Sequence, residues 1–357
     1  MSNRFPSGEI PRGALRFNTD SNRLELWDGY CWAEIELVTP DMGVSTSDAQ
    51  PGPRGVMAAG YQAPTNREAV NYINISSTGD ALDFGDLAVR LRYQAGCSSR
   101  TRGLTLGGYA VPGNNYPSTI YKTTIASTGS HLTFGNIKVG GSNSGLFGHA
   151  CFSNQTRALS CSGNDGAGGQ YDEIKYLTIA SDGDTVDFGE MTYNFRYGLC
   201  TGSKIRAMPM GGYSTTAENV INMVTISTLG DAQDFGDLSS YTSDSMGSTT
   251  NGIRSIIHIR HSSYSDVTLE SYDPTSGGTT TPWGDLSSQR QFSPMNTCLS
   301  SPIRGIFPGG TPAPGSAGAD GTIDYIEFST QGNAVDFGNM ETNMSSGSYF
   351  SSSHGGL

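Results

Sequence analysis

Acidic side chains next to a Phe-Gly pair recur along this sequence and are its most regular candidates for chemistry. They are Asp83, Asp187, Asp234 and Asp336. Carboxylates near glycine can bind calcium, but calcium takes six to eight oxygen ligands from one or two loops. The two candidate stretches for such a site, 80–86 and 182–184, are short and interrupted by glycine. We therefore expect the aspartates to serve a turn in each repeat, with calcium binding as the alternative.

The other reactive side chains lack the spacing of a catalytic or metal site. His258 and His261 are close in sequence, but their i, i+3 spacing in a strand places them on opposite faces. No Cys-x-x-Cys pair and no Gly-x-Ser-x-Gly motif occurs. Four cysteines lie five or six residues before a repeated arginine, which favours small buried thiols at one repeated position: Cys97, Cys151, Cys200 and Cys298. We predict no catalytic residue, no metal site, no cofactor and no enzymatic activity.

A repeat of about fifty residues sets the positions of these side chains. Its first landmark is an aromatic ring followed by glycine: Phe84, Phe134, Phe188, Phe235, Trp283 and Phe337. Its second landmark is an arginine followed by a small residue: Arg54, Arg102, Arg157, Arg206, Arg254 and Arg304. Between them lie a Gly-Gly-Tyr segment, a strand of alternating pattern such as 70–75, and a Gly-Asp turn. We assign these landmarks a structural role and expect four strands per copy.

Composition restricts the classes of function. The chain has 357 residues, 48 of them glycine, only 15% charged residues and a net charge of -12. An acidic chain without basic clusters is a poor binder of nucleic acid and of anionic lipid. No 20-residue apolar run and no signal sequence occurs, so we expect synthesis in a cytoplasm and no membrane insertion.

Six copies of four strands predict an all-β fold, a six-bladed β-propeller over residues 54–357, with blades starting near the six repeated arginines. The last residues, 345–357, match the strand that precedes the arginine in other copies. We expect them to complete the first blade and clasp the ring closed. An open β-solenoid and two stacked β domains are the alternatives. The fifth copy, 254–286, lacks Gly-Gly-Tyr, and we expect it to be irregular or modified for a contact.

Residues 1–40 have a different pattern, which predicts a small three-stranded β-meander joined to the repeats by a linker over residues 41–53. About thirty residues are too few to bury a core unaided. Its large apolar side chains should therefore pack on a partner and serve attachment or assembly: Phe17, Leu24, Leu26, Trp27 and Trp32. A cap on the first blade is the alternative.

The repeat resembles kelch repeats, with phenylalanine usually in place of the kelch tryptophan. It also resembles repeats in virion structural and tail-fibre-type proteins of tailed phages, notably marine and cyanobacterial ones. The matching segments are Thr101–Leu104, the Asp-Phe-Gly turns, His354–Leu357 and the N-terminal ALRFNTDSNRLELWDGYCWAEIEL. The resemblance covers nearly the whole chain. It implies location in a virion, with the N-terminal module bound to other virion proteins or to sister copies.

Loops that differ between repeats are the natural binding surface of such a scaffold. They contain tyrosines that could stack on sugars, and we name three candidate ligand residues: Tyr116, Tyr171 and Tyr264. The hypothesis is a non-enzymatic virion protein, a fibre, adhesin or capsid decoration that contacts host surface glycans. The alternatives are a free lectin-like or kelch interaction module and, in third place, a glycan-acting enzyme.

Overall fold

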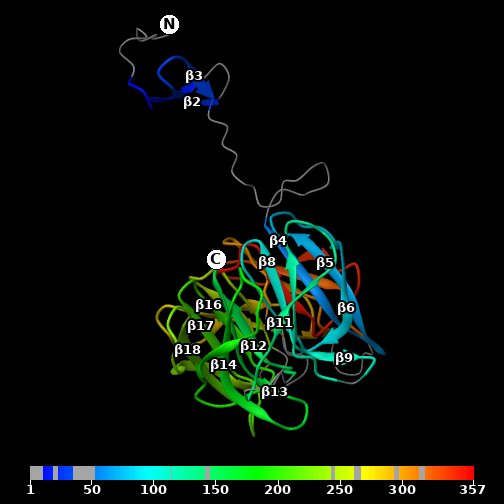
Figure 1. Ribbon diagram of the computed structural model, residues 1–357. Coiled ribbons are helices and arrows are strands. Elements are labelled where there is room, and N and C mark those ends of the chain that lie inside the picture. The colour runs from blue at the N-terminus through cyan, green and yellow to red at the C-terminus, as the bar shows by residue number, and fades with distance from the viewer. Residues whose placement is uncertain are drawn as a thin grey trace.

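The computed structural model describes residues 11–18, 23–34, 53–113, 115–140, 145–242, 246–260, 267–292, 297–312 and 318–357. Every regular element in these ranges is a β-strand, and nearly all strand pairs are antiparallel (Figure 1). The prediction of an all-β protein is therefore confirmed. The fold needs many tight turns, which the abundance of glycine supplies.

The N-terminal residues form a separate three-stranded antiparallel sheet. Its strands follow chain order: β1 (Leu15–Asn18), β2 (Arg23–Trp27) and β3 (Trp32–Glu34). Asp28 makes the second turn, because its Oδ1 accepts hydrogen bonds from the backbone N–H groups of Tyr30 (2.7 Å) and Cys31 (2.8 Å). These two bonds lower the pKa of Asp28.

Four sheets of the repeat region contain four strands that pair in the order of the chain. The second sheet is β7 (Ala95–Ser98), β8 (Arg102–Leu106), β10 (Thr119–Thr124) and β11 (Leu132–Asn136). The third is β12 (Ala150–Ser153), β13 (Arg157–Asn164), β14 (Gln170–Thr178) and β15 (Val186–Glu190). The fourth is β16 (Leu199–Gly202), β17 (Arg206–Met210), β18 (Glu218–Thr225) and β19 (Gln233–Thr242). The fifth is β20 (Gly247–Thr250), β21 (Ser255–His258), β22 (Thr268–Tyr272) and β24 (Thr281–Asp285), with the short β23 (Gly278–Thr279) paired parallel to β19. The fifth copy thus keeps the four-strand order without Gly-Gly-Tyr.

The first sheet joins the two ends of the repeat region. It contains β4 (Arg54–Gln62), β5 (Thr65–Asn74), β6 (Leu82–Arg92), β9 (Tyr109–Val111) and the last strand, β31 (Ser348–Ser351). β31 pairs antiparallel with β4, from Ser348 opposite Ala58 to Ser351 opposite Gly55. The last residues of the chain therefore supply a strand to the sheet that contains the first repeat.

The sixth sheet has three fully paired strands, β27 (Arg304–Pro308), β29 (Thr322–Glu327) and β30 (Val335–Asn339). The short β26 (Thr297–Cys298) precedes this sheet and pairs parallel with β31. Two residues after β26, Ser300 forms an isolated antiparallel bridge with Gly305 of β27. A further two-stranded pair is β25 (Arg290–Gln291) with β28 (Thr311–Pro312).

The first strands of the units also contact one another across sheets. β31 contacts β7, β7 contacts β12, β12 contacts β16, β16 contacts β20, β20 contacts β26, and β26 contacts β31. Serine hydroxyls add hydrogen bonds along this series: Ser153 Oγ donates to Ser98 O, Ser98 Oγ to Ser351 O, and Ser351 Oγ to Ser300 O, each at 2.8 Å. The series of neighbours therefore ends on the strand where it began.

The repeated arginines also link neighbouring sheets. Arg157 Nη1, at the start of β13, donates to the carbonyl oxygens of Ile226 (3.1 Å) and Ser227 (2.9 Å) just after β18. The same bond recurs from Arg54 to Ile125 and Ala126, Arg102 to Ile179, Arg206 to Pro274 and Thr275, Arg254 to Phe328, and Arg304 to Ile75 and Ser76. Arginine recurs because each copy has strand-end carbonyl groups that need a donor.

The Phe-Gly turn is a second contact between sheets. The Oδ1 of Asp83 accepts from the Gly85 N–H at 3.0 Å, and Asp234 and Asp336 make the same bond to the glycine two residues later. The glycine has no room for a side chain, because a Cβ on Gly135 would lie 2.0 Å from the carbonyl oxygen of Gly183 in the next sheet. Asp187 differs, since its Oδ1 accepts from Lys175.

The hydrophobic core lies between the sheets. One cluster combines Leu159 and Phe188 of the third sheet with Val224 and Ile226 of the fourth. Of the repeated rings, Phe84, Phe134, Phe188, Trp283 and Phe337 are buried, and Phe235 is half-buried. Both faces of the middle strands are therefore covered, and apolar burial holds neighbouring sheets together.

Candidate functional site

Aromatic and arginine side chains gather at one end of the first four sheets. They come from strand ends and connecting loops, and their rings and guanidinium groups form one continuous set of contacts. We call this set the aromatic–arginine face: Tyr61, Arg92, Tyr93, Tyr109, Tyr116, Phe147, Arg196, Tyr197 and Tyr213. Phe147 is buried and the others are half-buried, so part of each of those side chains is exposed.

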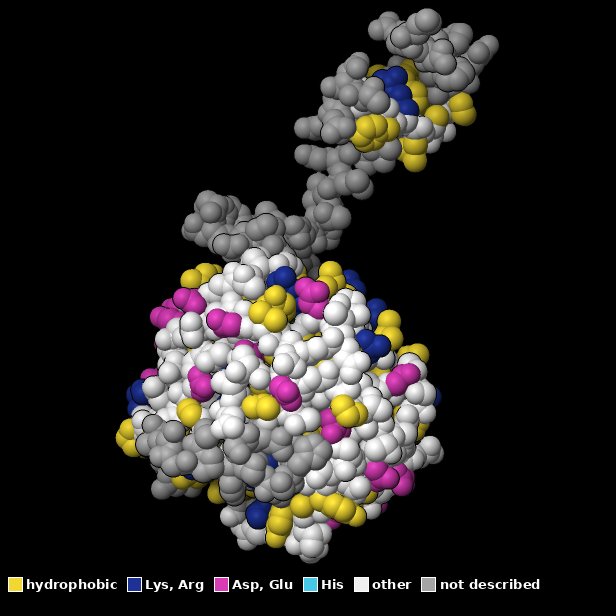
Figure 2. All heavy atoms as spheres, turned by 180° about the vertical axis from the view of Figure 1, so that it is seen from behind, with side chains coloured by type: hydrophobic (Ala, Val, Ile, Leu, Met, Phe, Trp, Pro, Cys, Tyr) yellow, Lys and Arg dark blue, Asp and Glu magenta, His cyan; other side chains and the backbone are white. Residues whose placement is uncertain are grey.

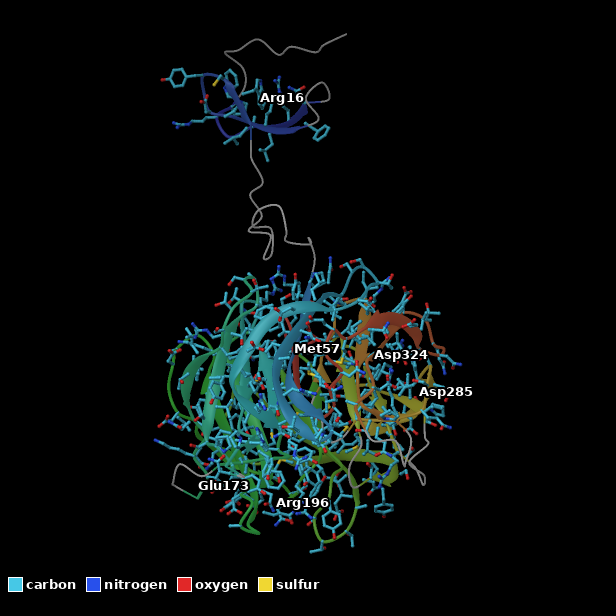
Figure 3. All side chains as sticks on the ribbon, turned by 90° about the vertical axis from the view of Figure 1, so that its right-hand side faces the viewer. Arg16, Met57, Glu173, Arg196, Asp285 and Asp324 are labelled. Atoms are coloured by element: carbon cyan, nitrogen blue, oxygen red, sulfur yellow. The ribbon has the colours of Figure 1, made fainter. Side chains whose placement is uncertain are left out.

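The aromatic–arginine face lies at the far end of β4 from the point where the chain enters the first sheet. β4 begins at Arg54, next to Ser352, and reaches Tyr61 next to Ser345. Figure 3 shows Arg196, another member of the face, at the lower end of the sheets. A molecule held by the chain that precedes Arg54 would therefore present this face outward.

Gly-Gly-Tyr segments place the tyrosines against the arginines. Tyr109 pairs with Arg92 in the ladder between β9 and β6, and Tyr213 forms the corresponding bridge with Arg196. The glycine before Tyr109, Gly108, has a φ of 105°, and a Cβ there would come within 2.8 Å of the Arg92 carbonyl oxygen. The same approach recurs before Tyr213. Glycine is required because the two backbones come this close.

Each arginine of the face lies over tyrosine rings. The Cζ of Arg92 is 4.8–4.9 Å from the ring centres of Tyr61, Tyr93 and Tyr109. The Cζ of Arg196 is 5.2 Å from the ring centre of Tyr213 and 5.4 Å from that of Tyr197. A guanidinium within about 6 Å of a ring centre is attracted by the π system, so these contacts hold the cations in place.

Neither guanidinium is neutralised within the described part of the chain. No carboxylate there forms an ion pair with Arg92 or Arg196. The Nε of each is buried and has no hydrogen-bond partner among the described residues. A buried donor without an acceptor costs about 1–3 kcal/mol. An anion bound by the remaining N–H groups of either guanidinium would neutralise its charge.

Three rings lie between the two arginines. The ring centres of Tyr93, Phe147 and Tyr197 are 5.9–6.3 Å apart, and Tyr116 stacks on Phe147 at 4.8 Å with an interplanar angle of 28°. Their polar hydroxyls and flat apolar surfaces suit a sugar ring, which offers C–H groups on its face and hydroxyls on its edge.

Tyr93 and Tyr197 adopt a backbone conformation that disfavours tyrosine. Their φ angles are 60° and 63°, and the equivalent positions in the first and third units are Ser346 (58°) and Gly148 (62°). The four are joined by hydrogen bonds: Tyr93 N–H to Ser346 O, Gly148 N–H to Tyr93 O and Tyr197 N–H to Gly148 O. A non-glycine residue here costs about 1–3 kcal/mol. Two tyrosines at a glycine-type position point to a role for their rings other than stability.

Of the three predicted ligand tyrosines, one belongs to the face. Tyr116 stacks on Phe147 within it. The Tyr171 hydroxyl donates to Asp165 Oδ2 at 2.9 Å, which raises the pKa of Tyr171, and its ring packs against the core of the second and third sheets. Tyr264 lies outside the described residues. The sequence analysis missed the arginines and Tyr93, although the Arg-Tyr dipeptide at 92–93 and 196–197 recurs at one position of the repeat.

The predicted attachment residues divide between two faces of the N-terminal sheet. Trp27 is buried, its ring centre is 5.4 Å from that of Trp32, and Arg16 covers Trp32 at 4.3 Å. On the other face, Leu15 pairs with Leu26 and Phe17 with Leu24 in the β1–β2 ladder. Leu15 and Phe17 are 59% and 58% exposed, and Leu26 is half-buried; the Leu24 side chain lies outside the described set. Figure 2 shows hydrophobic side chains on the surface of this sheet.

Three of the buried histidines are neutral near pH 7. Burial lowers the pKa of His131 and His354 to about 4 and that of His149 to about 3. His354 Nε2 donates to the Ser98 carbonyl oxygen at 2.9 Å, while its Nδ1 accepts from the Gly356 N–H. Among the residues with described positions, no group of three or more His, Cys, Asp and Glu is placed to hold a metal ion.

The cysteine positions need one correction. Cys151 and Cys200 occupy the same ladder position, opposite Ser160 and Pro209, but Cys97 lies one residue further along and faces Leu104. All three cysteines are buried, and the Cys298 side chain lies outside the described set. The spacing of five rather than six residues before Arg102 accounts for the shift.

Comparison with models of known protein families and with curated proteins gives no match for this sequence. No helix in the described residues has the length and apolarity to cross a membrane.

Proposed function

We propose that residues 54–357 form a closed six-bladed β-propeller with a kelch-like repeat. Two observations support ring closure. Contacts between the first strands of the units return from β26 to β31, and the arginine-to-carbonyl bonds return from Arg304 to the segment that follows β5. β31 then acts as the clasp that completes the first blade.

On this scaffold the chain is a non-enzymatic binding protein whose ligand is a surface glycan. The aromatic–arginine face carries this proposal, because it combines partly open tyrosine rings with unpaired donors. Its strained tyrosines, Tyr93 and Tyr197, are the strongest sign of selection for binding. The face lies away from Arg54, as expected of a displayed receptor-binding surface.

The N-terminal sheet is the attachment module in this proposal. Leu15 and Phe17 expose an apolar face that a partner can cover, and a sheet of this size gains stability from such a contact. The resemblance to phage virion proteins makes other virion proteins, or sister copies of this chain, the expected partners. The chain would then be a fibre, adhesin or decoration component of a phage particle, and many copies would add avidity.

Replacing both strained tyrosines should abolish glycan binding without unfolding the protein. Asparagine tolerates a positive φ, so Tyr93→Asn with Tyr197→Asn removes two rings and keeps the backbone. Central aromatic residues of an interface contribute about 2 kcal/mol or more, which is roughly a thirtyfold loss of affinity. The measurement is binding of the full chain to an array of bacterial surface polysaccharides, with the melting temperature recorded for each variant.

The matched control is Tyr241→Asn, because Tyr241 is 64% exposed on β19 and is not part of the face. Binding should be unchanged in that variant. Equal binding by the Tyr93/Tyr197 variant and the parent would remove the face from the proposal.

Removing residues 1–50 should prevent incorporation into phage particles and leave the propeller able to bind glycan. The reason is that the exposed apolar sheet is lost while residues 54–357 keep all nine members of the face. Immunogold labelling of purified particles, with antibody against residues 54–357, measures incorporation. Labelled particles after the truncation would contradict the attachment role. If the full chain gives no label on particles, the second candidate function, a free lectin-like module, is favoured. The observation behind this alternative is that residues 54–357 contain the whole aromatic–arginine face.

A further inference from the structure

We propose that the aromatic–arginine face selects an anionic polysaccharide, with acidic groups bound by Arg92 and Arg196 on either side of stacked sugar rings. This inference rests on the proposed glycan-binding function and adds the class of ligand. It follows from three observations about the two guanidinium groups: their lack of partners, their fixed orientation and their separation by aromatic rings.

Arg92 and Arg196 lack the partners that other cations of the described surface have. Some of those cations pair with acids, as in Arg90 with Glu68 and Lys122 with Asp182. The repeated arginines, such as Arg157, donate to backbone carbonyl oxygens instead. Acids outnumber bases by 33 to 21, so a carboxylate partner is available to most cations. On the face of the molecule that Figure 2 presents, the acidic side chains are spread out rather than gathered in one place. Two arginines left unpaired in one face therefore stand out as sites for an external anion.

The orientation of the arginines is fixed before any ligand binds. Tyrosine rings hold Arg92 between Tyr61 and Tyr109 and hold Arg196 beside Tyr213. A guanidinium fixed in this way offers its N–H fork to a carboxylate or sulfate with little further loss of side-chain entropy. Arginine is suited to this because it stacks on rings and donates in its own plane at the same time.

The separation of the arginines favours a polymer over a small anion. Arg92 lies on Tyr93, Tyr93 lies 5.9 Å from Tyr197, and Arg196 lies on Tyr197. Tyr93, Tyr197 and the adjoining Phe147 thus lie between the cations. A chain of sugars that carries repeated acidic groups can occupy both cationic positions while a sugar ring between them stacks on tyrosine. A single free anion can occupy only one.

The test is binding of the full chain to polygalacturonate, to its methyl ester, to dextran sulfate and to neutral dextran. We expect polygalacturonate or dextran sulfate to bind at least ~10-fold more tightly than the uncharged forms. If only polygalacturonate binds, the site takes carboxylates; if dextran sulfate binds equally, it takes both anions. Arg92→Met with Arg196→Met should reduce binding of the anionic polymer at least ~10-fold, because methionine keeps the apolar stem but removes the donors.

Arg90→Met is the matched control, since Arg90 is on the same strand as Arg92, is exposed and pairs with Glu68. It removes one positive charge by the same substitution and should leave binding unchanged. Equal loss in the control would show a general charge effect and overturn the inference. A second outcome would also overturn the inference: polygalacturonate and its methyl ester bind equally, and Tyr93→Asn with Tyr197→Asn abolishes both. That outcome would leave the proposed glycan-binding function intact. Binding of none of the four polymers would overturn the inference as well.

Discussion

Arg290→Met should be among the most destabilising single substitutions in this protein. Arg290 and Asp324 are both fully buried, and their Nη2 and Oδ2 atoms are 2.7 Å apart. Arg290 also donates to the carbonyl oxygens of Thr322 and Phe307, and burial lowers its pKa from the ordinary value. Removing the cation leaves the Asp324 carboxylate buried without its counter-charge. Breaking a buried pair in this way costs about 3–5 kcal/mol.

Urea unfolding of the parent and the variant measures the effect. Arg90→Met is the control, because the Arg90–Glu68 pair is exposed and such pairs contribute about 0–1 kcal/mol. A second variant that combines Arg290→Met with Asp324→Asn should recover part of the loss. The side-chain oxygen of asparagine at position 324 can still accept a hydrogen bond from Ser287, and asparagine carries no charge. In the parent, the N–H and Oγ of Ser287 both donate to Asp324. A loss for Arg290→Met as small as that for Arg90→Met would show that Asp324 is not desolvated.

Asp324 illustrates a limit of reading this sequence. In the equivalent strand of the first unit, residues 70–75 alternate between two faces, and each face carries one asparagine among larger, mostly apolar side chains. Yet Asn71 is as buried as Val70. The polar residue faces the neighbouring sheet, where Asn71 Oδ1 accepts from the Thr342 N–H at 3.1 Å. Alternation predicts the strand, but it cannot predict that a partner 271 residues away donates to the amide oxygen.

The repeat itself could be read from the sequence because each landmark makes a contact that recurs in every copy. Arg157 bonds the carbonyl oxygens of the next sheet, and the Phe-Gly glycine fits against the next turn. Contacts of this kind permit few substitutions, so they leave a visible pattern. The order of strands follows from that pattern, including the strand supplied by residues near 350.

The aromatic–arginine face could be predicted only in part. Tyr116 was found because it lies in a loop that differs between repeats. Tyr93 was missed, because nothing in its sequence context reveals a positive φ or its closeness to Tyr197, 104 positions later. The arginines could not be predicted, because the sequence around an arginine does not show whether its guanidinium stacks on rings without an acidic partner or is solvated. Such a site depends on which loops the sheets bring together.

Removal of residues 345–357 should prevent the repeat region from folding cooperatively. Two of the residues removed, Tyr349 and Phe350, are completely buried or nearly so. The Phe350 ring occupies the space beside Gly103, where a Cβ would lie only 2.0 Å from it. Their loss would expose the edge of β4, remove the neighbour of β7 and leave an apolar gap between two sheets. Losing each large side chain costs about 3–5 kcal/mol, which together approaches the whole stability of a domain.

A shorter truncation separates the strand from the segment that follows it. Removing 353–357 keeps β31 but deletes three hydrogen bonds to three different sheets, namely Ser353 Oγ to Ser300 O, His354 Nε2 to Ser98 O and Gly355 N–H to Thr250 O, each at 2.9 Å. At about 1 kcal/mol each, the melting temperature should fall by several degrees while unfolding stays cooperative. Circular dichroism melts of both truncations provide the comparison. A cooperative melt for the longer truncation at the parent's temperature would contradict the proposed clasp, because the proposed closed ring would lose the strand that joins its first and last sheets.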